Sequence, residues 1–184
     1  MNTFCLRNNL FLFLLTSLVI TAACAKSNLS VALVKSDKDK KSVVNAIVSK
    51  YKNDELLTSQ LISVKGNDLD FLAIPALSSD KPAPGCYIQT LNSKRELIGR
   101  YLIEKNEDAQ SCEAVLAIFP CRLQKMRGLG IIYGMRLGSN NYYTESSYFE
   151  IVANGVLKSD NSGTKLISGI ESATLAKKKL ECIK

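Results

Sequence analysis

The spacing of apolar residues beyond position 56 constrains the fold of this chain more than any other feature. From there to position 158, apolar runs with the two-residue period of β-strands are separated by turn residues. The strongest turn signal is Asn154-Gly155, a pair typical of a type I′ hairpin. Together with an earlier apolar run, the segments that we interpret as strands cover residues 29–34, 56–64, 69–77, 87–91, 97–104, 114–119, 131–137, 148–153 and 156–158.

Two segments follow the helical period instead. Ser36 and Asp39 form a capping signal, and the apolar residues after it predict a helix over residues 37–52. Ser168 and Glu171 form a second capping box, which predicts a helix that runs to about Cys182. The order of strands and helices indicates an α+β fold, with one antiparallel, curved multi-stranded sheet and both helices packed on one side of it.

The N-terminus has the three-part layout of a secretory signal peptide. Arg7 precedes an apolar run over residues 11–23, and the small residues around Cys24 follow as a cleavage site. We therefore expect residues 1–25 to be removed, leaving a single domain over residues 26–184 in the periplasm of a Gram-negative bacterium. The same residues also resemble a loose lipoprotein box, so the alternative is an outer-membrane lipoprotein acylated at Cys24.

Four cysteines lie beyond the expected signal: Cys86, Cys112, Cys121 and Cys182. In an oxidising compartment an even number predicts two disulfides. The favoured pairing is Cys112–Cys121 with Cys86–Cys182, because the first bond would close a short loop. If residues 114–119 form a fully extended strand, Cys112 and Cys121 lie too far apart, and Cys86–Cys112 with Cys121–Cys182 becomes the better choice. The spacing lacks the C-x2-C pairs of a zinc site, so no metal is expected.

The sequence contains no histidine, which excludes Ser-His and Cys-His nucleophile pairs and H-E-x-x-H zinc sites. Ser49 to Lys52 matches S-x-x-K, but the accompanying motifs of penicillin-binding proteins are absent. Glu104, Glu107 and Asp108 could be read as a carboxylate pair, although a solvated turn explains them better. We expect no enzymatic activity and no cofactor, with a hydrolase that uses carboxylates alone as the remaining enzymatic alternative.

Residues 138–148 combine tyrosine with serine, asparagine and glycine between two predicted strands. This mixture is typical of recognition loops, and it makes Asn140, Asn141, Tyr142, Tyr143 and Glu145 the candidate binding residues. Neighbouring side chains on an extended backbone point in opposite directions, so only one of the two tyrosines can reach the core. The alternative interpretation is a plain hairpin connection whose tyrosines fold back on the core.

The net charge of +7, of which Arg7 contributes one, is too mild and too dispersed for nucleic-acid binding. We therefore expect an exported binding protein that is not an enzyme and holds a protein partner, for example as an inhibitor or immunity-type protein for a toxin or hydrolase. The alternative is an envelope-anchored accessory lipoprotein with a structural role, and only that form would contact a membrane. Nothing in the sequence identifies the partner or the oligomeric state.

Overall fold

The computed structural model describes residues 29–79, 85–106, 110–123, 126–138 and 141–175. The expected signal peptide with Cys24, and residues 176–182 of the predicted C-terminal helix with Cys182, lie outside these residues. The elements are β1 (Ser30–Leu33), α1 (Asp37–Val48), β2 (Asp54–Leu56), η1 (Thr58–Gln60), β3 (Ile62–Lys65), β4 (Asp70–Ser78), β5 (Gly85–Asn92), β6 (Leu97–Lys105), β7 (Gln110–Leu123), β8 (Met126–Leu137), β9 (Asn141–Ala153), β10 (Val156–Ser159) and α2 (Asn161–Ile167). No helix in this part of the chain is long and apolar enough to cross a membrane.

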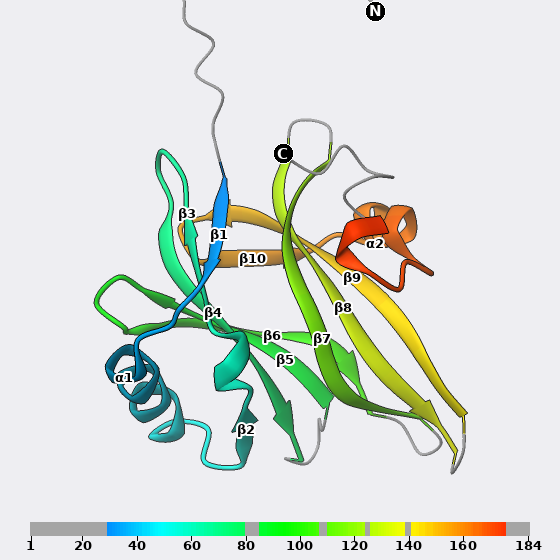
Figure 1. Ribbon diagram of the computed structural model, residues 1–184, viewed down its shortest axis with the longest axis horizontal. Coiled ribbons are helices and arrows are strands. Elements are labelled where there is room, and N and C mark those ends of the chain that lie inside the picture. The colour runs from blue at the N-terminus through cyan, green and yellow to red at the C-terminus, as the bar shows by residue number, and fades with distance from the viewer. Residues whose placement is uncertain (1–28, 80–84, 107–109, 124–125, 139–140, 176–184) are drawn as a thin grey trace, which may run out of the picture.

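The strands form two antiparallel sheets, so the prediction of a single curved sheet is wrong. Sheet A has six strands in the order β1-β3-β4-β5-β6, with β2 also on β4, and sheet B has four in the order β10-β9-β8-β7. Helix α1 packs on the outer face of sheet A and α2 on the outer face of sheet B (Figure 1). The helices therefore cover opposite faces, and the molecule is richer in strand than the predicted α+β fold.

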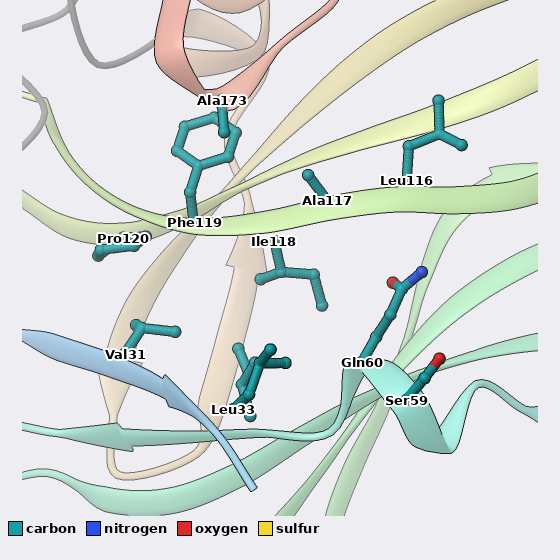
Figure 2. A pocket seen from close by; sticks show the side chains of 11 residues that line it. Val31, Leu33, Ser59, Gln60, Leu116, Ala117, Ile118, Phe119, Pro120 and Ala173 are labelled. Carbon is teal, nitrogen blue, oxygen red and sulfur yellow. The ribbon is translucent and has the colours of Figure 1, made fainter. Parts of the chain in front are cut away.

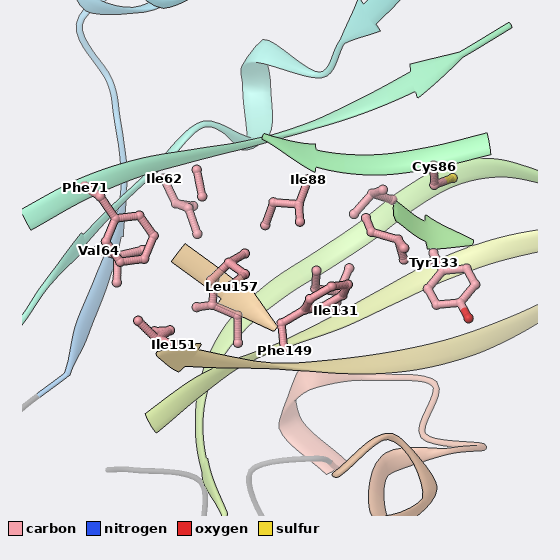
Figure 3. Packing of buried hydrophobic residues seen from close by; sticks show 14 of the residues in the cluster. Ile62, Val64, Phe71, Cys86, Ile88, Ile131, Tyr133, Phe149, Ile151 and Leu157 are labelled. Carbon is pink, nitrogen blue, oxygen red and sulfur yellow. The ribbon is translucent and has the colours of Figure 1, made fainter. Parts of the chain in front are cut away.

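The main core lies between the two sheets. Figure 3 shows Phe71 and Ile88 of sheet A facing Ile131 and Phe149 of sheet B, and all four side chains are at most 2% exposed. Burying a side chain of this size contributes about 1.5–3 kcal/mol. Each inner face uses every second residue of its strands, which explains the strict two-residue period in the sequence.

The predicted strand over residues 56–64 is two strands joined by η1. Strand β2 pairs with the C-terminal end of β4, where Asp54 lies opposite Ser78. Strand β3 pairs with the N-terminal end of β4, where Ile62 lies opposite Ala73. Both strands therefore lie along one edge of β4, and η1 shifts the chain between them. An apolar run alone does not reveal such a shift, because its residues still fit a strand.

The predicted helix start at Ser36 is confirmed, and the predicted start at Ser168 is wrong. The Ser36 hydroxyl accepts from the Asp39 amide at 3.3 Å, and α1 ends at Val48 rather than at residue 52. Helix α2 begins after Asp160, whose carboxylate accepts from the Ser162 amide at 3.0 Å. Ser168 is the C-cap of that helix, so it closes a helix instead of opening one.

The disulfide of the described residues joins Cys86 of β5 to Cys112 of β7, with the Cα atoms 5.7 Å apart. The favoured pairing is therefore wrong. Cys112 and Cys121 lie in one extended strand, where nine residue steps separate their Cα atoms by about 30 Å. Cys121 is also disulfide-bonded, and the predicted Cys121–Cys182 bond stays a prediction because Cys182 lies outside the described residues. A disulfide between the sheets is consistent with an oxidising compartment.

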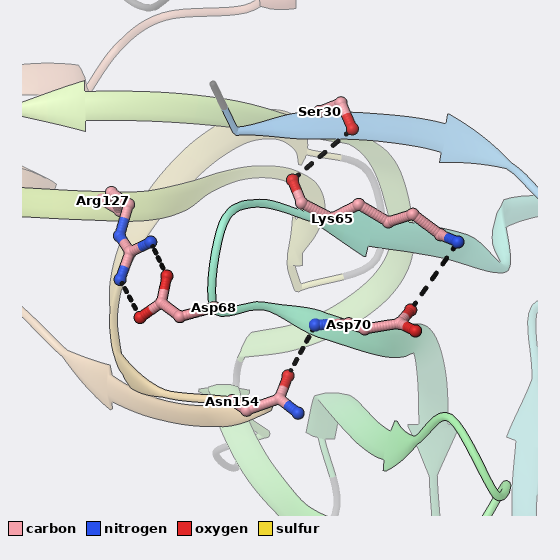
Figure 4. A network of polar contacts seen from close by, with 6 residues as sticks. All are labelled: Ser30, Lys65, Asp68, Asp70, Arg127 and Asn154. Atoms are coloured by element: carbon pink, nitrogen blue, oxygen red, sulfur yellow. Dashed lines mark hydrogen bonds and ion pairs between the residues drawn. The ribbon is translucent and has the colours of Figure 1, made fainter. Parts of the chain in front are cut away.

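Polar contacts tie the turn between β3 and β4 to sheet B (Figure 4). The Arg127 guanidinium of β8 binds both carboxylate oxygens of Asp68, one of them at 2.9 Å. The Asn154 side chain accepts from the Asp70 amide, also at 2.9 Å. The two sheets are therefore joined at this end by side chains, as they are joined elsewhere by the disulfide.

Candidate functional site

The predicted recognition loop is mostly a paired strand. Strand β9 begins at Asn141 and pairs in register with β8, so that Tyr142 lies opposite Arg136 and Glu145 opposite Tyr133. Tyrosine and threonine favour strands, which outweighs the turn preference of asparagine and serine here. Of the candidate residues, Asn141, Tyr142, Tyr143 and Glu145 lie on this strand, and Asn140 lies outside the described residues.

The two tyrosines point to opposite faces of sheet B, as the sequence predicts. Tyr143 packs against the core between the sheets. Tyr142 lies on the outer face and is 54% exposed. Its ring covers Gly134, where a Cβ atom would collide with the Tyr142 hydroxyl. The exposed aromatic side chain therefore rests on the sheet and is not at the tip of a loop.

The outer face around Tyr142 also carries charge. Arg136, directly opposite Tyr142 across the strand pair, forms an ion pair with Glu113 of β7 at 2.6 Å. This surface combines an aromatic ring with a guanidinium and its carboxylate partner, and we call it the hairpin surface: Tyr142, Arg136 and Glu113.

The inner face of the same hairpin carries phenols and carboxylates. The Tyr133 hydroxyl donates to Glu104 Oε2 of β6 at 3.1 Å, and the Ser147 hydroxyl donates to Tyr133 at 3.4 Å. The Tyr143 hydroxyl accepts from the Gln110 side chain at 2.6 Å. Strands of both sheets thus contribute polar groups beside the main core.

Burial and the two glutamates keep both phenols protonated. Desolvation raises the pKa of Tyr133 far above its usual value, and Glu104 and Glu145 raise it further. Desolvation, followed by the same two carboxylates, also raises the pKa of Tyr143. These tyrosines therefore act at neutral pH as uncharged hydrogen-bonding groups, and neither is poised to lose a proton.

The candidate catalytic residues make other contacts or lie outside the described residues. Glu104 is bound to Tyr133, and its proposed carboxylate partners Glu107 and Asp108 lie outside the described residues. Ser49 of the S-x-x-K match donates its hydroxyl proton to the Ala46 carbonyl at the end of α1, at 3.1 Å. Within the described ranges, no three histidine, cysteine, aspartate or glutamate residues come together as a metal site would require.

The sequence predicts that one of the two tyrosines points outward, but it identifies neither which one nor the residues around it. Tyr133 lies within the predicted strand 131–137. Nothing in that segment reveals that the Tyr133 hydroxyl meets Glu104 of the other sheet. Gln110 lies between two predicted strands, outside both, and is the first residue of β7. The chain matches no protein-family model, and no curated protein or solved structure shows significant similarity to it.

Proposed function

We propose that this chain is an exported binding protein of the periplasm, without enzymatic activity, that holds a protein partner through the hairpin surface. The observation that carries the proposal is Tyr142, which is 54% exposed although it lies on a strand paired in register with β8. An inhibitor or immunity-type role, in which the partner is a toxin or a hydrolase, is the form that we favour.

The position of Tyr142 suits a binding anchor. Tyrosine and arginine are enriched among the residues that dominate protein interfaces, because they combine large contact area with hydrogen bonding. Here both side chains stand opposite each other on paired strands, and Gly134 leaves the ring room to lie on the sheet. Little conformational freedom is lost when such a surface binds, which favours affinity.

The proposal is tested by capture of the partner from the host's own cells. The wild-type protein serves as bait beside Tyr142→Ala and Val152→Ala. Val152 is 50% exposed on the same face of β9, so it controls for the loss of an exposed apolar side chain. We expect wild type and Val152→Ala to retain one partner and Tyr142→Ala to lose it. Equal recovery with all three baits would contradict the proposed surface.

A further inference from the structure

An open groove of about 360 Å³ runs along the free edge of β7. Strand β7 is the last strand of sheet B and β1 the last strand of sheet A, so the groove separates two sheet edges. Figure 2 shows Ile118 of β7 pointing toward Val31 and Leu33 of β1. Leu33 and Leu116 are 59% and 47% exposed, so two large apolar side chains that line the groove are partly exposed to solvent.

The groove has an apolar, uncharged lining. Two of the lining side chains, Ser59 and Gln60, are polar, and none is charged. The other lining residues are Val31, Leu33, Ile62, Leu116, Ala117, Ile118, Phe119, Pro120 and Ala173. A charged group would lose its hydration here without gaining a partner, so the part of a ligand that enters the groove is uncharged and apolar.

The edge of β7 is poorly suited to an added peptide strand. The Val115 carbonyl already accepts from the Gln60 side chain, and the strand pairing shifts at Leu116. Pro120 has no amide proton to offer. Between Leu116 and Pro120, this leaves only residues 117–119 of β7 for regular pairing with an added strand. Natural sheets protect their edges with bulges and prolines of this kind.

The groove is also too small for a stable contact with a folded protein. Eleven residues line it, whereas each side of a stable protein interface contributes about 20–30. Its volume of about 360 Å³ instead lies within the range of roughly 300–1,000 Å³ that is common for small-molecule sites.

We propose that this groove binds one unbranched aliphatic chain of a single-chain amphiphile taken up from solution, with the head group left in water. The apolar walls contact the chain, the blunted strand edge requires no hydrogen bonds from it, and the exposed Leu33 and Leu116 belong to the lining. This site is independent of the hairpin surface and of any protein partner.

Titration calorimetry with octyl, decyl and dodecyl maltoside, each kept below the concentration at which micelles form, tests the proposal. These probes share one uncharged head group and differ only in the length of the chain. Because each buried methylene adds a constant transfer free energy, affinity should rise about fourfold per methylene until the groove is filled.

A variant pair assigns the binding to the groove. The double variant Leu33→Asn with Leu116→Asn should bind decyl maltoside at least tenfold more weakly, because both changes place a polar group in the apolar lining. Val152→Asn, at a similarly exposed position outside the groove, should bind as wild type does. All variants should keep the wild-type melting temperature without ligand, since the replaced side chains are largely in solvent.

Several results would overturn the proposal. These are no measurable binding of any maltoside, an affinity independent of chain length, or equal affinity in the double variant and the wild type. Co-sedimentation with phosphatidylglycerol vesicles in the absence of maltoside binding would assign the groove to a membrane surface, and binding of an extended apolar peptide alone would assign it to a protein partner. Either outcome rejects a soluble single-chain ligand.

Discussion

Three glycines of β8 each leave room for an aromatic ring on the outer face of sheet B. Phe119 covers Gly130, Tyr148 covers Gly128 and Tyr142 covers Gly134, and a Cβ atom on any of these glycines would collide with the ring. The rings differ in how readily they can move aside, because Phe119 is 2% exposed and Tyr142 is 54% exposed. Substitution of the glycines should therefore have different consequences.

Gly130→Ala and Gly134→Ala form a matched pair. The Phe119 ring is buried in the cluster beneath α2, so Gly130→Ala should lower the free energy of unfolding by about 1–3 kcal/mol. The Tyr142 ring can swing into solvent, so Gly134→Ala should change stability little and weaken partner binding. Urea unfolding and partner affinity of both variants check this. An equal loss of stability in the two variants would contradict it.

Tyr148 should make the fold sensitive to alkali. Desolvation by burial raises its pKa to about 12, whereas an unfolded tyrosine titrates near 10. The folded state favours the neutral phenol. The contribution of Tyr148 to the free energy of unfolding is therefore complete below about pH 10 and is lost as pH rises through 12. Between about pH 10 and pH 12, the free energy of unfolding of Tyr148→Phe should fall less steeply with pH than that of the wild type. Identical slopes for variant and wild type would reject the assignment.

At the scale of elements, local signals predicted the structure wherever a few neighbouring residues determine it. The cap at Ser36 and the hairpin at Asn154-Gly155 are both present. The type I′ geometry is not, since Gly155 adopts a positive φ of 74° and Asn154 does not, and the pairing shifts at Val156 and Leu157 instead. Helix α2 was missed because its short sequence, with Gly163 inside, carries a weak helical period.

The junction between α1 and β2 depends on a buried ion pair that no local signal predicts. The Arg100 guanidinium of β6 binds both oxygens of Asp54 at 2.9 Å and lies 3.3 Å from the centre of the Tyr87 ring. Gln89 donates to the same carboxylate at 2.5 Å. The Asp54 side chain is 0% exposed, so its removal leaves a largely buried cation without its carboxylate.

We expect Asp54→Ala to lower the free energy of unfolding by about 3–5 kcal/mol, the range for breaking a buried ion pair from one side. Asp37→Ala is the matched control, because the Asp37 side chain is 98% exposed beside Lys40. That change should cost about 1 kcal/mol or less. Denaturant unfolding of the two variants measures the difference, and similar costs would show that the buried pair contributes no more than the surface one.

At the scale of the whole molecule, the sequence could not distinguish one curved sheet from two packed sheets. Both arrangements bury every second residue of each strand, so both give the same period. The contacts that separate them join residues distant in the chain, such as Glu104 with Tyr133 and Cys86 with Cys112. For the same reason the sequence did not reveal which residues surround Tyr142, and the alternation of side chains indicated only that one of the two adjacent tyrosines points outward.

The disulfide between Cys86 and Cys112 should stabilise the packing of the two sheets. In the chain-entropy account, a closed loop of 26 residues contributes about 3–4 kcal/mol. In urea unfolding, the variant with both cysteines replaced by alanine should lose about this much of the free energy of unfolding.

Peptide mapping without reduction should recover Cys86 with Cys112 and Cys121 with Cys182. Recovery of Cys121 as a free thiol would contradict the second bond.

The central claim is that the protein binds its partner through Tyr142, and the affinity of two variants for the purified partner tests it most directly. Tyr142→Ala should keep the wild-type melting temperature and lose about 2 kcal/mol or more of binding free energy. Tyr143→Ala should melt lower, because its ring packs on the core, and should bind with little change at temperatures where it is folded. If Tyr142→Ala binds as tightly as wild type, the hairpin surface is not the binding site.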